Sequence, residues 1–204
     1  YRKSLGFELA KENNISADVV VPIPDSGVSA ALGFSQKSSI PFELGIIRSH
    51  YVGRTFIEPS QTIRQFGVKL KHSVNRSCIE DKRVILIDDS IVRGTTASKI
   101  VKMVYEAGAK EVHLGISCPP IKHPDFYGID TPNYNELIAS KSNIEEMTEL
   151  VGAKSLFFLS LNGTYKAMGY NERNKELPQF TDHCFTGEYP IDISEILKIN
   201  SYNA

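Results

Sequence analysis

Short apolar runs alternate with helically spaced apolar residues along most of the chain. Five apolar runs predict buried strands, at residues 18–23, 42–47, 84–87, 111–117 and 156–159. Helical spacing predicts helices at the start of the chain, after residue 27, over 97–107 and, more briefly, over 134–139 and 144–151. Because strands alternate with helices, we expect an α/β fold with a mostly parallel, doubly wound sheet and right-handed crossovers.

Two stretches depart from this alternation. Residues 48–76 are polar, show no convincing strand period, and hold six Lys or Arg against one acid, Glu58. Such a cluster can be an ordinary solvated face, but long polar loops in compact domains are usually binding loops, and a basic one suits an anionic substrate. After Lys166 the periodicity fades, and 178–190 is typical of extended chain packed on a surface. We therefore predict a domain over 1–165 and a C-terminal extension over 166–204.

The composition limits the classes of function. The 204 residues carry a net charge of −1, which gives no reason to expect nucleic acid or an acidic membrane as partner. No apolar run approaches the roughly 20 residues of a membrane helix. Three widely spaced cysteines favour reduced thiols in a cytoplasmic protein, and five histidines show no ligand spacing for structural zinc. Because the chain opens with Tyr1 inside a predicted helix, we expect a domain of a longer protein.

The segment Val84–Thr96, with the sequence VILIDDSIVRGTT, contains the clearest candidate chemistry. Its apolar strand ends in two adjacent carboxylates, Asp88 and Asp89, and a turn rich in hydroxyls leads into the next helix. Free backbone N–H groups and the helix dipole at that point attract an anion. Side chains alternate along an extended chain, so the two acids point in different directions and can hold hydroxyls or a hydrated Mg²⁺. The alternative is an Asp that caps the helix beside a solvated neighbour.

A second turn leaves the end of an earlier strand. Residues 24–27 (Pro-Asp-Ser-Gly) follow the 18–23 run, and Ser26 is placed to cap the helix that begins after it. In parallel sheets, ligands bind beyond the carboxyl ends of strands, near the point where the strand order reverses. We therefore expect this turn and the loop over 88–96 to converge on one ligand.

The Val84–Thr96 string resembles the phosphoribosyl pyrophosphate (PRPP) motif of type I phosphoribosyltransferases. Its Ser90–Thr96 ending is similar to that of the glutamine PRPP amidotransferases. Further segments resemble the same family in the same order, at 21–27, 51–57, 127–130 with 136–139, and 184–190. The chain is identified as a member of this amidotransferase family over nearly its whole length.

This resemblance implies a type I phosphoribosyltransferase fold with a flexible loop over 48–76 and an irregular C-terminal extension. It implies transfer of a phosphoribosyl group from PRPP to ammonia, which gives 5-phosphoribosylamine and pyrophosphate in the first committed step of purine synthesis. The family takes its ammonia from glutamine in an upstream glutaminase domain. We expect that domain to be absent from this chain, which would then use ammonia only. Further copies of the chain are expected as partners in a homo-oligomer.

The resemblance also implies the residues of the site. Ser26, Asp88 and Asp89 would surround Mg²⁺, and Asp88, Asp89 and Lys71 would be catalytic. The residues implied in PRPP binding are Asp88, Asp89, Ser90, Ile91, Val92, Arg93, Gly94, Thr95, Thr96, Arg48, Arg54 and Lys71. Arg48 stands where many relatives carry lysine, which keeps the charge but changes the donor geometry.

Some members of the family hold an iron–sulfur cluster through cysteines. At the corresponding positions this chain carries Thr181 and Asp125, and only Cys184 remains. Four thiolates cannot be assembled from these positions, so we expect no iron–sulfur cluster.

Two other functions share the PRPP loop. A salvage phosphoribosyltransferase would use a free purine or pyrimidine base, but the 51–57 and 184–190 segments argue against it. A non-catalytic PRPP-sensing regulator would usually add a nucleic-acid surface, for which the balanced charge gives little support.

Overall fold

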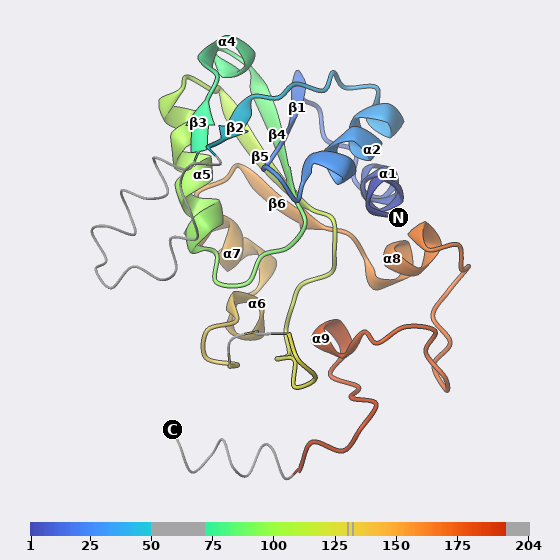
Figure 1. The fold of residues 1–204 in the computed structure, drawn as a ribbon. Coiled ribbons are helices and arrows are strands. Elements are labelled where there is room, and N and C mark those ends of the chain that lie inside the picture. The colour runs from blue at the N-terminus through green and yellow to red at the C-terminus, as the bar shows by residue number, and fades with distance from the viewer. Residues whose placement is uncertain (50–71, 130, 132, 195–204) are drawn as a thin grey trace.

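The computed structural model describes residues 1–49, 72–129, 131 and 133–194 (Figure 1). Its helices are α1 (Arg2–Glu12), α2 (Val28–Ser38), α4 (Arg76–Ile79), α5 (Thr95–Glu106), α6 (Ile138–Lys141), α7 (Ile144–Val151), α8 (Leu161–Ala167) and α9 (His183–Thr186). Its strands are β1 (Val19–Pro22), β2 (Ile46–Arg48), β3 (His72–Val74), β4 (Arg83–Asp88), β5 (Glu111–Ile116) and β6 (Ser155–Phe158). The strands predicted at 18–23, 84–87, 111–117 and 156–159 are confirmed as β1, β4, β5 and β6.

Four parallel strands form the main sheet in the order β1-β4-β5-β6. On the other edge of β1, Val20 N donates to Pro41 O at 2.8 Å, and Glu43 N donates to Val20 O at 3.0 Å. After β1 and α2, the chain therefore runs along one edge of β1, and it later forms β4 along the opposite edge of β1. The strand order reverses at β1, which is the doubly wound arrangement that the sequence predicts.

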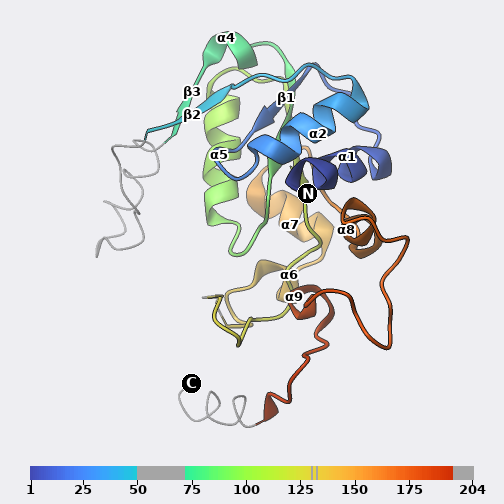
Figure 2. The ribbon, with the colours of Figure 1, turned by 45° about the vertical axis from the view of Figure 1, so that its right-hand side comes forward.

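The two faces of the sheet pack against different helices (Figure 2). In β4, Val84 and Leu86 belong to the core formed with α5 and α7, whereas Ile85 and Ile87 belong to the core formed with α1 and α2. All four side chains are fully buried, so this strand has no polar face. Burial on both faces explains why β4 is a continuous apolar run in the sequence rather than an alternating pattern.

A small antiparallel ribbon, β2–β3, packs at the edge of the α5 core. Ile46 pairs with Val74, and Ile46 is buried in that core. The predicted strand over 42–47 is only partly right, because Phe42 makes an isolated bridge to β1 and β2 begins at Ile46.

The expectation of no strand between 48 and 76 is wrong at β3, since three residues are too few to show a period. The basic stretch from 50 to 71 lies outside the described residues.

The helix predicted over 134–139 begins later, at Ile138, after a turn over 134–136. The predicted domain boundary at 165 falls inside α8, a helix of seven residues that is too short to show a clear helical period in the sequence. The division into two parts stays a prediction. None of the described helices is long and apolar enough to cross a membrane.

Polar contacts hold the C-terminal extension. Asp182 accepts from Tyr165 Oη at 2.8 Å and from Arg173 Nε at 2.6 Å, and Arg173 Nη2 pairs with Glu188 at 2.5 Å. Burial alone would raise the pKa of Asp182. The hydrogen bonds that its carboxylate accepts, above all from Arg173, instead hold this pKa below its usual range. The expectation of extended chain over 178–190 is wrong at α9, a single turn that leaves no periodic pattern.

Helices α1 and α2 approach each other through glycine. A Cβ at Gly6 would lie 1.8 Å from the backbone oxygen of Ala30, and one at Gly33 would lie 1.9 Å from that of Lys3. No side chain fits in either gap, so the two helix backbones are in direct contact.

We predict that Gly6→Ala destabilises the protein by about 1–3 kcal/mol, because the added methyl group forces α1 away from Ala30 O. A solvent-facing helical glycine would behave in the opposite way, since alanine favours the helix by about 1 kcal/mol. Chemical denaturation measures the free energy of unfolding. Ser4→Ala, at an exposed position of the same helix, is the control and should be neutral or slightly stabilising. A Gly6→Ala protein as stable as the wild type would refute the close contact.

Candidate functional site

The loops that follow β1 and β4 meet at the point where the strand order reverses. Ile23 N donates to Ile87 O at 2.9 Å, which extends the pairing of the two strands by one residue. A Cβ at Gly27 would lie 2.1 Å from Ile87 O, so only glycine allows the first loop to come this close. The two loops therefore lie together as predicted, and that they share one ligand stays a prediction.

Ser26 points toward β4 rather than toward its own helix. Its hydroxyl donates to Asp88 Oδ1 at 3.2 Å. The N-cap of α2 is Gly27, and no side chain caps that helix. The prediction that Ser26 caps α2 is therefore wrong, because the close approach of the strands offers its hydroxyl a carboxylate instead.

Asp88 is half-buried and enclosed by donors. Its Oδ1 also accepts from Asp89 N at 2.8 Å, and its backbone oxygen accepts from Ser117 N at 2.9 Å and from Ser117 Oγ at 3.1 Å. Burial, and then the neighbouring Asp89 carboxylate, raise the pKa of Asp88 to about 7. A bound cation would relieve both effects, so this carboxylate is placed to hold positive charge.

The second carboxylate, Asp89, has a different environment. It accepts from Ser90 Oγ at 3.3 Å, while Asp88 contacts Ser26, as expected for side chains that alternate along a strand. Neither acid caps α5, since its N-cap is Gly94 and has no side-chain cap bond. The helix-cap alternative for these aspartates is therefore wrong.

A cavity of about 260 Å³ lies over the loop and the start of α5. It is lined by all residues from Ser90 to Ala97, together with Asp88 and Thr131. The loop turns into the helix at Gly94, whose φ of 75° is a conformation that favours glycine. The first N–H groups of α5 have no partner within the helix and, with the helix dipole, make this cavity suitable for a phosphate-sized anion.

Some predicted ligands line this cavity but direct their side chains elsewhere. Ile91 is buried in the core, so its contribution to a ligand would come from its backbone. Arg93 Nε donates to Glu136 Oε2 at 2.5 Å, and Ile138 N donates to Val92 O at 2.9 Å. These contacts brace the outer side of the loop against the 136–138 segment.

The remaining predicted site residues lie around the first loop or beyond the described part. Arg48, the last residue of β2, pairs through Nη1 with Asp25 Oδ2 at 2.6 Å, which places its charge beside Ser26. Arg54 and Lys71 lie outside the described residues. Within those residues, the structure therefore brings Ser26, Asp88, Asp89 and the 90–96 loop together and pairs Arg48 with Asp25, the residue before Ser26.

Sequence reasoning missed three contributors. Ser117 holds the backbone of Asp88, Thr131 lines the cavity, and Glu136 engages Arg93. Ser117 left a signal, because it ends a predicted strand that neighbours β4, and Glu136 opens the 136–139 segment that resembles the amidotransferase family. Thr131 left none, because it lies more than 30 residues beyond the loop, where no local pattern links it to the site.

The oxygen donors at the strand ends fit a magnesium ion. Mg²⁺ prefers oxygen ligands and is usually held by one or two carboxylates together with substrate phosphates. Asp88 and Asp89 supply two carboxylates, Ser26 adds a hydroxyl, and the raised pKa of Asp88 reflects an uncompensated negative charge.

We predict that Asp88→Asn stabilises the metal-free protein at neutral pH. The folded-state pKa of Asp88 lies above its ordinary value of 3.8, so the group supports the fold fully below about pH 4 and loses that contribution as the pH rises toward 7. Asn removes the charge and keeps the Oδ1 acceptor. Its advantage over wild type should grow between pH 4 and pH 8, by at most about 4 kcal/mol, in denaturation measured with a chelator present.

Asp81→Asn is the control for loss of a surface charge, because the Asp81 side chain is 85% exposed. A stability difference between Asp88→Asn and wild type that does not change with pH would contradict the assigned environment of Asp88.

Comparison with known proteins places the chain in a family. Residues 4–128 match the model of the phosphoribosyl transferase domain. The amidophosphoribosyltransferase of Rhizobium etli is 63% identical over 93% of this chain and 38% of its own length, and that of Bacillus subtilis is 52% identical over 94% and 40%. The chain thus spans about two fifths of these curated relatives.

A solved structure agrees with the sequence comparison. The glutamine PRPP amidotransferase from Bacillus subtilis, complexed with ADP and GMP, matches with a TM-score of 0.85 and 51% identity, over 95% of this chain and 42% of that one. The predicted type I phosphoribosyltransferase fold is confirmed. The chain belongs to the phosphoribosyl transferase domain family and corresponds to that part of the amidophosphoribosyltransferases.

Proposed function

We propose that this chain transfers the phosphoribosyl group of PRPP to ammonia and forms 5-phosphoribosylamine, the first committed step of purine synthesis. The observation that carries the proposal is the junction of Ser26, Asp88 and Asp89 beside the cavity of the 90–97 loop. This junction offers a cation site next to an anion site, as a sugar with a phosphate and a pyrophosphate requires. The identity to amidophosphoribosyltransferases supports ammonia as the acceptor.

The 90–97 loop would hold the 5-phosphate. Ser90, Thr95 and Thr96 line the cavity, and their hydroxyls, together with the backbone N–H groups at the start of α5, would supply donors. The phosphate then fixes the ribose relative to the carboxylates. Such orientation lowers the barrier because the reacting groups no longer have to find their geometry.

The carboxylates would act on the ribose and on the leaving group. Ammonia is already a nucleophile, and the demanding step is cleavage of the bond between the ribose C1 and pyrophosphate, through a cationic, oxocarbenium-like state. Ammonia nitrogen forms the new bond to C1, pyrophosphate leaves with the electron pair, and one N–H proton passes to solvent. Asp88 and Asp89 favour the developing positive charge on the ring.

Positive charge is also needed at the pyrophosphate. A magnesium ion would be held by Ser26, Asp88 and Asp89. When bound, the ion would offset the negative charge of the departing pyrophosphate. Arg48, which pairs with Asp25 in the same loop as Ser26, would add positive charge. We propose that Lys71 and Arg54, in the basic 50–71 stretch, complete the pyrophosphate contacts and that this stretch excludes water, which competes with ammonia.

The ammonia is proposed to come from glutamine in another part of the full-length protein. The curated relatives are more than twice as long as the part that this chain matches. We also propose a cytoplasmic location, which the free thiols of Cys78, Cys118 and Cys184 support, and self-association of the full protein.

Pyrophosphate release tests the proposal. The chain, given PRPP, Mg²⁺ and ammonium, should release pyrophosphate, and the Asp88→Asn/Asp89→Asn double variant should lose at least about 100-fold in rate because both carboxylates act at the reacting centre. Asp81→Asn, far more exposed, should keep wild-type activity. Equal rates for the wild type and the double variant would sink the proposal, and release that depends on a purine or pyrimidine base would favour a salvage transferase instead.

Arg93 allows a test of how the phosphate is held. Its guanidinium is engaged by Glu136, so we expect Arg93→Ala to change the KM for PRPP by less than about threefold. Thr96→Val removes the hydroxyl of a residue that lines the cavity and should raise the KM about tenfold, the value of one lost hydrogen bond. Steady-state kinetics distinguish the two. A larger effect for Arg93→Ala would mean that its side chain leaves Glu136 to bind phosphate.

A further inference from the structure

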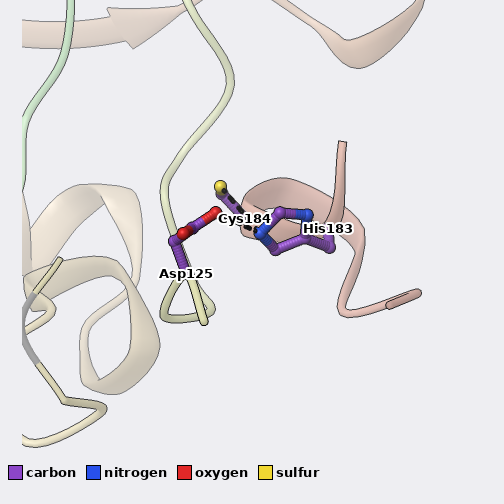
Figure 3. A group of neighbouring side chains, drawn as sticks. All are labelled: Asp125, His183 and Cys184. Atoms are coloured by element: carbon purple, nitrogen blue, oxygen red, sulfur yellow. Dashed lines mark hydrogen bonds and ion pairs between the residues drawn. The ribbon is translucent and has the colours of Figure 1, made fainter. Parts of the chain in front are cut away.

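Three side chains of different chemistry, none of which lines the cavity of the 90–97 loop, lie close together (Figure 3). Asp125 comes from the chain that follows β5, and His183 and Cys184 come from α9. One potential ligand atom of each lies within 4.8 Å of the others. His183 Nε2 is 2.8 Å from Asp125 Oδ2 and 3.6 Å from Cys184 Sγ.

The surroundings hold the donors in place. Asp125 Oδ1 accepts from Tyr127 N at 2.8 Å and from Ile129 N at 2.9 Å, which leaves Oδ2 directed at His183. Asp125 is 9% exposed and His183 is 3% exposed. Backbone contacts that orient a carboxylate in this way are typical of the outer shell of metal sites.

The segment before Asp125 is fixed to the helix that carries the other two donors. The backbone oxygen of Cys184 accepts from Lys122 N at 2.9 Å and from His123 N at 3.1 Å. The His183 ring packs against those of Tyr127 and Tyr189, each with centroids 5.0 Å away. The donors therefore come from two segments that are already joined, and a ligand bound there would not have to assemble them.

We propose that Asp125, His183 and Cys184 form a mononuclear site for a divalent transition metal of the zinc type, with a fourth position open to water. In tetrahedral zinc sites, bonds of about 2.0 Å to nitrogen and about 2.3 Å to sulfur put those ligand atoms about 3.6 Å apart. The observed separation of Nε2 and Sγ is 3.6 Å. The carboxylate oxygen must move outward by about 0.5 Å to reach the corresponding nitrogen–oxygen separation.

The mixed donor set decides which metal fits. Mg²⁺ takes oxygen ligands and an iron–sulfur cluster requires thiolates, whereas zinc accepts nitrogen, sulfur and oxygen together. Coordination replaces the thiol proton of Cys184, which passes to the buffer, and moves the ring proton of His183 from Nε2 to Nδ1. The ion would cross-link α9 to the chain after β5 and so fasten the C-terminal extension.

The second nitrogen of His183 limits the affinity. Among the described residues, His183 Nδ1 is buried without a hydrogen-bond partner. It must carry the ring proton once Nε2 binds metal, and loss of such an outer contact typically weakens metal binding by about 10- to 100-fold. Without metal, the Nε2 proton donates to Asp125, and the same residues form a hydrogen-bonded clasp.

Metal titration of the full chain, freed of metal with a chelator, distinguishes these states. With Co²⁺ as the probe, we expect one ion per chain and a thiolate-to-cobalt charge-transfer band that Zn²⁺ removes. Cys184→Ser should abolish the band, and Cys118→Ser is the matched control, since Cys118 donates to Pro119 O and is not one of the three ligands. Asp125→Asn should weaken binding at least about tenfold, because a charged ligand is lost.

Stability provides an independent readout. Zn²⁺ should raise the midpoint of thermal unfolding for wild type and Cys118→Ser but not for Cys184→Ser, whose far-ultraviolet circular dichroism verifies folding. Absence of stoichiometric binding, or an equal band in Cys184→Ser, would overturn the metal site and leave a hydrogen-bonded clasp only. Neither measurement uses PRPP, so this result is separate from that of the pyrophosphate assay.

Discussion

The close approach of two backbones at the carboxyl ends of β1 and β4 is the constraint on which the candidate active site depends. Ile23 N donates to Ile87 O, and Gly27 lies where any Cβ would collide with that same oxygen. Because nothing larger than hydrogen separates the strands there, Ser26 reaches Asp88. A small steric requirement therefore joins two loops that lie about sixty residues apart in the chain, and it does so at the point where the strand order reverses.

The two acids at this junction differ because the fold treats them differently. Asp88 is enclosed by Ser26, Ser117 and the backbone of Asp89, and its raised pKa shows that a negative charge there lacks compensation. The cation proposed above would offset this charge and recover the free energy that its burial costs. Under that proposal, the carboxylate that binds the cation also lowers the stability of the metal-free fold, as is common for binding sites.

The C-terminal extension is held on a different principle. It has little apolar core of its own, and its anchors are buried polar pairs: Asp182 with Tyr165 and Arg173, and Asp125 with His183. Such pairs contribute less than apolar packing of equal size, but removal of one partner leaves an uncompensated buried charge. A few specific polar pairs therefore fix the position of the extension. Such pairs are enough to place a segment beside a site, although they would not be enough to form a separate domain.

Local patterns along the chain were enough to predict the main sheet and the loop between β4 and α5. Strands that are buried on both faces give continuous apolar runs in the sequence. The change from Asp88 and Asp89 to a glycine-containing turn marks the end of a strand before a helix. Neighbouring residues alone therefore predict β4, α5 and the loop between them. The tertiary structure alone decided which groups those local features meet. Three-residue β3 and single-turn α9 are too short for any period, and the role of Ser26 changed from a helix cap to a partner of Asp88. Asp125 meets His183 58 positions away for the same reason: hydrogen bonds and steric contacts depend on distance in space, which no local pattern of residues records.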